Sequence, residues 1–171
     1  MVAAIVTVVA VGFVPSGAGA GTAFDRGGIS VRVPKGWSLT QRRINGVLDP
    51  VTVFTVSTFR VGTGGTSTGG ICSPPLRHAW RPDGGYLQLT EERDGASLAR
   101  MLRRVPRRPR HFRLNGTGWG GLCTPPDSGE LSFREHGRAF YVFYGFGRTA
   151  PKRLRAQAVA MLDAMRISRS R

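Results

Sequence analysis

Cysteine, lysine, histidine and acidic residues are all scarce in this chain of 171 residues. It has 2 cysteines, 3 histidines and 10 Asp plus Glu against 25 Lys plus Arg, and only Lys35 and Lys152 are lysine. So few carboxylates and histidines leave little material for a metal centre or an acid–base pair. No stretch recurs at the spacing of repeat proteins, which excludes a solenoid.

Long hydrophobic runs are also absent. The longest uncharged apolar run, at 2–14, is shorter than the roughly 20 residues of a membrane-spanning helix. It has the length of a signal-peptide core and is followed by Ala18-Gly19-Ala20, which matches a cleavage site. We expect residues 1–20 to be a signal peptide and residues 21–171 to be a single exported domain without a lipid anchor. No Lys or Arg precedes the run, so an uncleaved anchor and a buried strand stay open as alternatives.

Apolar residues and positive charge are what the chain does have. Hydrophobic residues make up 40% of it and aromatic residues 9%, which excludes full disorder, and its formal charge is +15. A positive surface attracts anionic envelope polymers, anionic lipid and acidic proteins alike. We do not expect nucleic acid as a partner, because an exported protein rarely meets it.

The two cysteines stand in matching surroundings. Cys72 and Cys123 each follow Gly-Gly and an apolar residue and precede a hydroxyl residue and Pro-Pro. In an exported chain an even number of cysteines indicates a disulfide, and closing a loop of this length stabilises a fold by about 4 kcal/mol. A reactive or metal-binding thiol pair is the weaker alternative, because the chain has no Cys-x-x-Cys motif.

Alternating apolar residues predict three strands in the first half of the domain. They are a strand at 29–33, a long strand at 48–61 that we expect to be central, and a strand at 86–91 whose Leu87 and Leu89 face the core. The segment 62–70 has no side chain larger than Thr and predicts a loop.

The second half mixes helices with a hairpin. We expect a short helix at 74–79, a helix at 96–104, a brief strand at 111–114, and a hairpin of 130–133 with 138–144 around a His136-Gly137 turn. A C-terminal helix is predicted by apolar residues on one face, with Pro151 in its first turn and Thr149 or Ala150 as its cap. These apolar residues are Leu154, Ala158, Met161, Leu162 and Met165.

Together the elements predict an α+β domain. It would have an antiparallel sheet of about five to seven strands with the C-terminal helix packed on one face.

Arginines concentrate between residues 99 and 114. A guanidinium group binds phosphate or carboxylate through two parallel hydrogen bonds, so this cluster is a candidate anion-binding site. An alternative is that it only reflects the arginine-rich composition of the chain. The residues are Arg100, Arg103, Arg104, Arg107, Arg108, Arg110 and Arg113.

Catalytic motifs are missing from the sequence. There is no Gly-x-Ser-x-Gly elbow and no P-loop ending, and no two histidines have metal-ligand spacing. We predict no catalytic residues, no metal and no cofactor. A small hydrolase stays open if His78 or His111 meets Glu91 or Glu92 in the fold.

One family resemblance is carried by the two ends of the domain. The strand ending in Val33-Pro34-Lys35-Gly36-Trp37 and the helix ending near Leu162-Asp163-Ala164-Met165 resemble small exported actinobacterial proteins with the PsbP and Mog1-like fold. The resemblance implies an antiparallel sheet covered by helices and a role in binding or assembly. It carries over no functional residue.

The sequence thus predicts an exported, non-catalytic binding or envelope-associated module. Two alternatives remain, which are a basic protein that binds anionic polymers or lipid through its arginines, and the hydrolase.

Overall fold

A computed structural model describes residues 21–41, 50–61, 81–115 and 127–169. These residues form eight strands and two helices. The strands are β1 (Thr22–Arg26), β2 (Ile29–Val33), β3 (Ser38–Thr40), β4 (Val51–Ser57), β5 (Gly85–Glu92), β6 (Asp127–Glu135), β7 (Arg138–Phe146) and β8 (Arg166–Ile167). The helices are α2 (Gly95–Arg104) and α3 (Lys152–Ala164).

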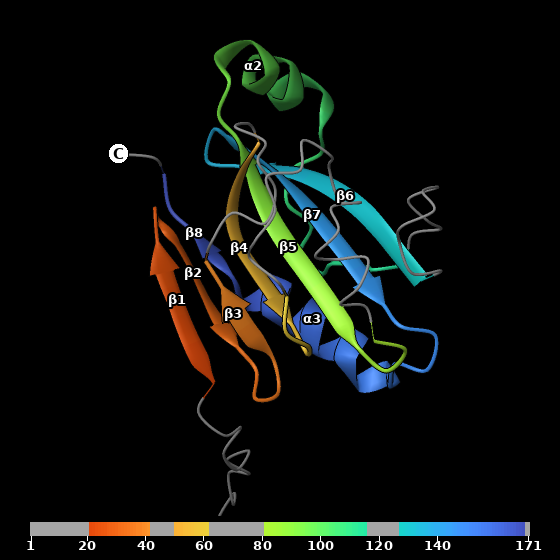
Figure 1. Cartoon of the computed structure of the whole chain (residues 1–171). Coiled ribbons are helices and arrows are strands. Elements are labelled where there is room, and N and C mark those ends of the chain that lie inside the picture. Colours follow the sequence, from red (N-terminus) through yellow and green to blue (C-terminus); the bar gives the residue numbers. More distant parts are fainter. Residues whose placement is uncertain (1–20, 42–49, 62–80, 116–126, 170–171) are drawn as a thin grey trace, which may run out of the picture.

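The strands divide between two antiparallel sheets. One has three strands in the order β1-β2-β8, and the other has five in the order β3-β4-β5-β7-β6. Helix α3 crosses behind β5 and contacts both β5 and β2, while α2 stands beyond the upper ends of β5 and β7 (Figure 1). The predicted α+β class, the antiparallel pairing and the C-terminal helix packed against sheet are confirmed.

Strand β5 is the centre of the larger sheet. It pairs with β4 on one side and β7 on the other, and all eight of its residues are buried. Leu87 and Leu89 are fully buried, as predicted. The expected central strand at 48–61 is wrong in extent and position. Strand β4 ends at Ser57, whose hydroxyl donates to the carbonyl of Phe59 in a bend, and it lies beside the centre.

The predicted hairpin forms between β6 and β7. Its two turn residues, His136 and Gly137, have φ angles of 53° and 77°. Two successive left-handed residues make the tight turn whose twist matches that of paired strands, and glycine occupies the second position without strain. The strands on either side are longer than the sequence pattern indicated.

The core lies between the two sheets and α3. The predicted apolar face of α3 is buried there, and it consists of Leu154, Ala158, Met161, Leu162 and the following Met165. The expected cap at Thr149 or Ala150 is wrong. Pro151 itself is the N-cap, no side chain caps the helix, and the Pro151 carbonyl accepts from the Leu154 amide at 2.9 Å.

Helix α2 confirms the helix predicted at 96–104. The Asp94 side chain accepts a hydrogen bond from the Ser97 amide at 2.9 Å, which satisfies a donor of the first turn. Leu98, Met101 and Leu102 lie on one side of the helix and are buried or half-buried. No helix in the described part of the chain is both long and apolar enough to cross a membrane.

The predicted strand at 111–114 is wrong. The segment is irregular, although Phe112 and Leu114 are buried in the core. The Phe112 amide donates at 2.8 Å to the Asp163 carboxylate at the end of α3, so its partner is a side chain and not a strand. The helix predicted at 74–79 and the loop predicted at 62–70 lie outside the described residues.

Candidate functional site

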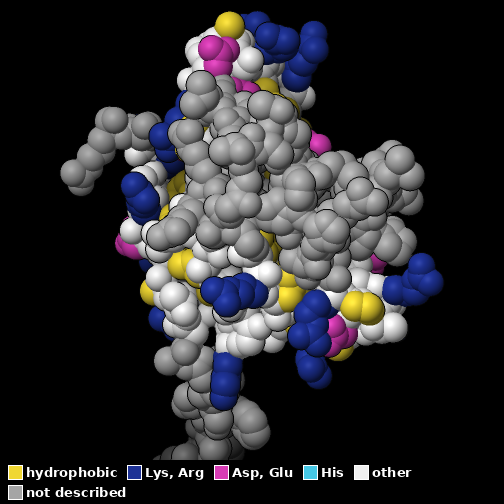
Figure 2. All heavy atoms as spheres, in the orientation of Figure 1, with side chains coloured by type: hydrophobic (Ala, Val, Ile, Leu, Met, Phe, Trp, Pro, Cys, Tyr) yellow, Lys and Arg dark blue, Asp and Glu magenta, His cyan; other side chains and the backbone are white. Residues whose placement is uncertain are grey.

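Six of the seven predicted site arginines are exposed. Three lie on α2 and three on the segment that follows it, and dark blue side chains gather at the α2 end of the molecule in Figure 2. None of the six has an ion pair with a carboxylate of the described residues. They are Arg100, Arg103, Arg104, Arg107, Arg110 and Arg113.

Arg108 is the exception, because its guanidinium group makes contacts within the fold. Its Nη1 donates to Glu135 at 3.0 Å, and its Nη2 donates to the Leu162 carbonyl at 2.6 Å, at the C-terminal end of α3. Its guanidinium carbon also lies 5.7 Å from the centre of the Phe112 ring. A cation at this end of a helix meets carbonyls that have no partner within the helix. The prediction that Arg108 is an anion-binding residue has no support in this geometry.

A cavity of about 550 Å³ opens between the end of α2 and the β6–β7 turn. Backbone hydrogen bonds build its wall. The Arg108 amide donates to the Arg134 carbonyl at 3.0 Å, and the Arg134 amide donates to the Pro106 carbonyl at 2.9 Å, which fixes residues 106–108 alongside β6. The lining residues are Leu102, Arg107, Arg108, Arg134, Glu135, His136 and Gly137.

Positive charge exceeds negative charge in this cavity. Its one carboxylate, on Glu135, is engaged by Arg108. Arg107 and Arg134 face the same space without an ion pair to any described carboxylate. The Nε of Arg134 donates to the Val105 carbonyl at 3.0 Å, which orients the guanidinium group. Two arginines that line one cavity suit a carboxylate, sulfate or phosphate group.

Sequence reasoning found Arg107 but missed Arg134. Arg134 is 27 residues along the chain from Arg107 and belongs to another element, and their isolated parallel bridge is what brings them together. The nearest signal in the sequence was the His136-Gly137 turn, which places the end of β6 at a sheet edge. No local pattern linked that turn to the arginine-rich segment.

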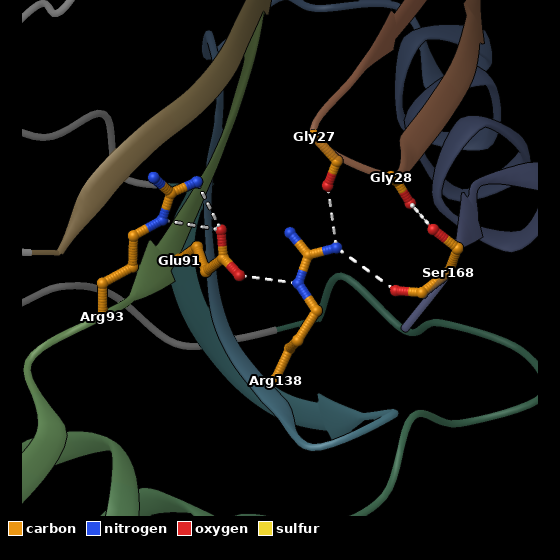
Figure 3. A network of polar contacts seen from close by, with 6 residues as sticks. All are labelled: Gly27, Gly28, Glu91, Arg93, Arg138 and Ser168. Atoms are coloured by element: carbon orange, nitrogen blue, oxygen red, sulfur yellow. Dashed lines mark hydrogen bonds and ion pairs between the residues drawn. The ribbon is translucent and has the colours of Figure 1, made fainter. Parts of the chain in front are cut away.

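A second polar cluster joins the two sheets, and Figure 3 shows it with Glu91 between two arginines. The Nε of Arg138 donates to one Glu91 oxygen at 2.6 Å, and Arg93 donates to the other at 2.8 and 3.0 Å. The Nη1 of Arg138 also donates to the carbonyls of Gly27 and Ser168, at 3.0 and 3.3 Å. Strand β7 is thereby tied to the β1–β2 turn and to the residue after β8.

Glu91 is held ionised by this cluster. Burial raises the pKa of its carboxyl group, but hydrogen bonds and charge from Arg138 and Arg93 outweigh burial, so that the pKa is lowered from its ordinary value. A carboxylate bound on both oxygens in this way is a structural partner and a poor general base.

The residue pairs proposed for a hydrolase do not form among the described residues. Glu91 is bound by arginines, and Glu92 accepts the Asp94 amide at 3.2 Å. His111 lies 3.4 Å from Asp163, but its side chain is 86% exposed and does not line the cavity. His78, like Cys72 and Cys123, lies outside the described residues, so the disulfide stays a prediction.

Comparison with models of protein families, with curated proteins and with solved structures found no match. The resemblance to the PsbP and Mog1-like fold therefore stays a prediction.

Proposed function

We propose that the protein is an exported, non-catalytic binding module that holds an anionic group of its ligand in the cavity between α2 and the β6–β7 turn. The observation that carries the proposal is that Arg107 and Arg134 both line one cavity whose single carboxylate is already paired. An anion placed there would meet two guanidinium groups and no free negative charge.

The arrangement of the cavity favours binding over attachment by overall charge. Arg134 is oriented by the Val105 carbonyl, and Arg107 is held next to it by the backbone bonds of its neighbours to β6. A preorganised guanidinium group such as that of Arg134 loses less conformational entropy on binding than a free surface side chain does. The remaining exposed arginines of α2 would raise the local concentration of an anionic ligand.

The proposal is tested by calorimetric titration of the full chain with galacturonate, which carries one carboxylate. Arg107→Gln should weaken binding by about 10-fold, the loss of one charge-assisted contact of about 1.5 kcal/mol. The matched control is Arg32→Gln, which removes another exposed arginine, on β2 outside the cavity, and should weaken binding by less than about 2-fold. Equal losses of affinity in the two variants would contradict the proposal, because they would show that the protein attracts anions by overall charge alone.

Export is part of the proposal, because it selects anionic envelope polymers over nucleic acid as partners. We expect a mature chain that starts near Gly21 and has a bond between Cys72 and Cys123. Mass spectrometry of the protein recovered from the medium, alkylated with and without reductant, measures both features. An intact Met1 together with two alkylated cysteines in the unreduced sample would contradict export.

A further inference from the structure

Two further cavities extend the anion-binding cavity along the same end of the molecule. The second has a volume of about 570 Å³ and shares Gly137 with the first. The third has a volume of about 470 Å³ and shares Gly27, Glu91, Arg93 and Arg138 with the second. Because neighbouring cavities share lining residues, the three adjoin one another between the end of α2 and the β1–β2 turn, and together they are called the groove below.

Each part of this groove contains an arginine without a carboxylate partner among the described residues. These are Arg107 and Arg134 in the first cavity, Arg169 in the second and Arg26 in the third.

The other arginines of the groove are paired and form its walls. Arg108 binds Glu135, and Arg93 and Arg138 bind Glu91, the cluster drawn in Figure 3, where the second and third cavities meet. Available positive charge therefore recurs along the groove instead of gathering at one point. A ligand with a single anionic group would use only one of these positions.

The rest of the groove lining includes neutral polar groups and one further carboxylate, on Glu92, which accepts the Asp94 amide at 3.2 Å. Gly137 joins the first two cavities, and no atom lies within 4 Å of the position that a Cβ atom would occupy there. Gln41 lines the third cavity, and Ser168 and the backbone of Gly28 line the second. The open space at Gly137 leaves room for a bulky ring unit, and neutral donors and acceptors suit sugar hydroxyl groups.

We infer that the ligand is a linear anionic polysaccharide, with carboxylate or sulfate groups on successive sugar units, that lies along the whole groove. This inference rests on the proposed function, because the first cavity is one of its three contact points. Affinity would come from several modest contacts made by one chain, so that each further contact forms at a high effective concentration. Arg26 and Arg169 should then matter only to ligands long enough to reach them.

The test is calorimetric titration of the full chain with oligogalacturonates of increasing length, with neutral malto-oligosaccharides of the same lengths as controls. For the native chain, affinity should rise by about 100-fold from the monosaccharide to the longest oligomer. The double variant Arg26→Gln/Arg169→Gln should leave monosaccharide binding unchanged and should weaken binding of the longest oligomer by about 10-fold. Arg32→Gln/Arg148→Gln removes two exposed arginines outside the groove and should weaken either ligand by less than about 2-fold.

The outcomes separate this inference from the proposed function. If no galacturonate of any length binds, both fail. If the monosaccharide binds through Arg107 and affinity does not rise with length, the proposed function stands and the groove is overturned. The groove is also overturned if the two double variants weaken the long oligomer equally, or if malto-oligosaccharides bind as well as oligogalacturonates. Oligoglutamate with the same number of carboxylates should bind at least about 10-fold more weakly, and equal binding would overturn the assignment to a polysaccharide.

Discussion

Replacing Arg138 by Met removes the most buried cation of the described structure and keeps much of its apolar volume. The Arg138 side chain is 6% exposed and its partner Glu91 is 8% exposed. The variant loses the ion pair, the two hydrogen bonds to the carbonyls of Gly27 and Ser168, and the contact of the guanidinium group with the Phe140 ring at 5.2 Å. The two carbonyl contacts hold β7 to the smaller sheet, and the ion pair with Glu91 holds it to β5.

The size of the stability loss depends on the charge that stays buried after the substitution. Removing one partner of a buried ion pair costs about 3–5 kcal/mol, because the other charge stays buried without compensation. Here Arg93 still neutralises Glu91, so we expect the lower end, about 3 kcal/mol. For a domain of this size that loss lowers Tm by about 6–12 °C.

Urea unfolding of the native chain and of Arg138→Met measures this free energy. A second variant, Arg138→Met with Glu91→Leu, removes both charges and should recover part of the loss, because no carboxylate is then left buried. The reasoning is refuted if Arg138→Met loses less than about 1 kcal/mol, or if the loss in the double variant equals the sum of the losses measured separately for Arg138→Met and for the single variant Glu91→Leu.

Two further predictions concern the same charged groups. Arg108→Gln should lower the free energy of unfolding by about 2 kcal/mol, because Glu135 and the end of α3 lose their partner. Replacing the exposed Arg107 by Gln should change it by less than about 0.5 kcal/mol. Urea unfolding of both variants measures these losses, and similar losses would contradict the separate roles of the two arginines. The pKa of the Glu91 carboxyl is lowered in the fold, so its stabilising contribution is complete above its ordinary value of 4.5 and is lost as the pH falls through the lowered folded value. The stability difference between the native chain and Glu91→Gln should therefore shrink on acidification, and a difference that grew instead would show that this direction is wrong.

Local sequence patterns predicted those elements that are determined by residues close together in the sequence. The His136-Gly137 turn, the apolar face of α3 and the buried leucines of β5 each follow from the spacing or backbone freedom of neighbouring residues. The strand expected at 111–114 failed for the opposite reason. Its buried Phe112 is satisfied by Asp163, 51 residues away, and no pattern of neighbours reports such a contact.

The candidate site was predicted in part, for the same physical reason. The concentration of arginine was visible in the sequence, but the sequence could not separate Arg107, which faces a cavity, from Arg108, which binds Glu135 and the end of α3. Adjacent residues point in different directions, and the partners that decide their roles come from other elements. Arg134 and Arg138 were missed because their side-chain contacts lie 29 to 111 residues away.

The central claim is that an anionic group binds at one place, between the end of α2 and the β6–β7 turn. Nuclear magnetic resonance of the ¹⁵N-labelled chain during a galacturonate titration tests this residue by residue. The account predicts saturable amide shifts at Arg107, Arg134 and Gly137, while Arg32 and Arg148 do not move. Small shifts without saturation, spread over every exposed arginine, would contradict it.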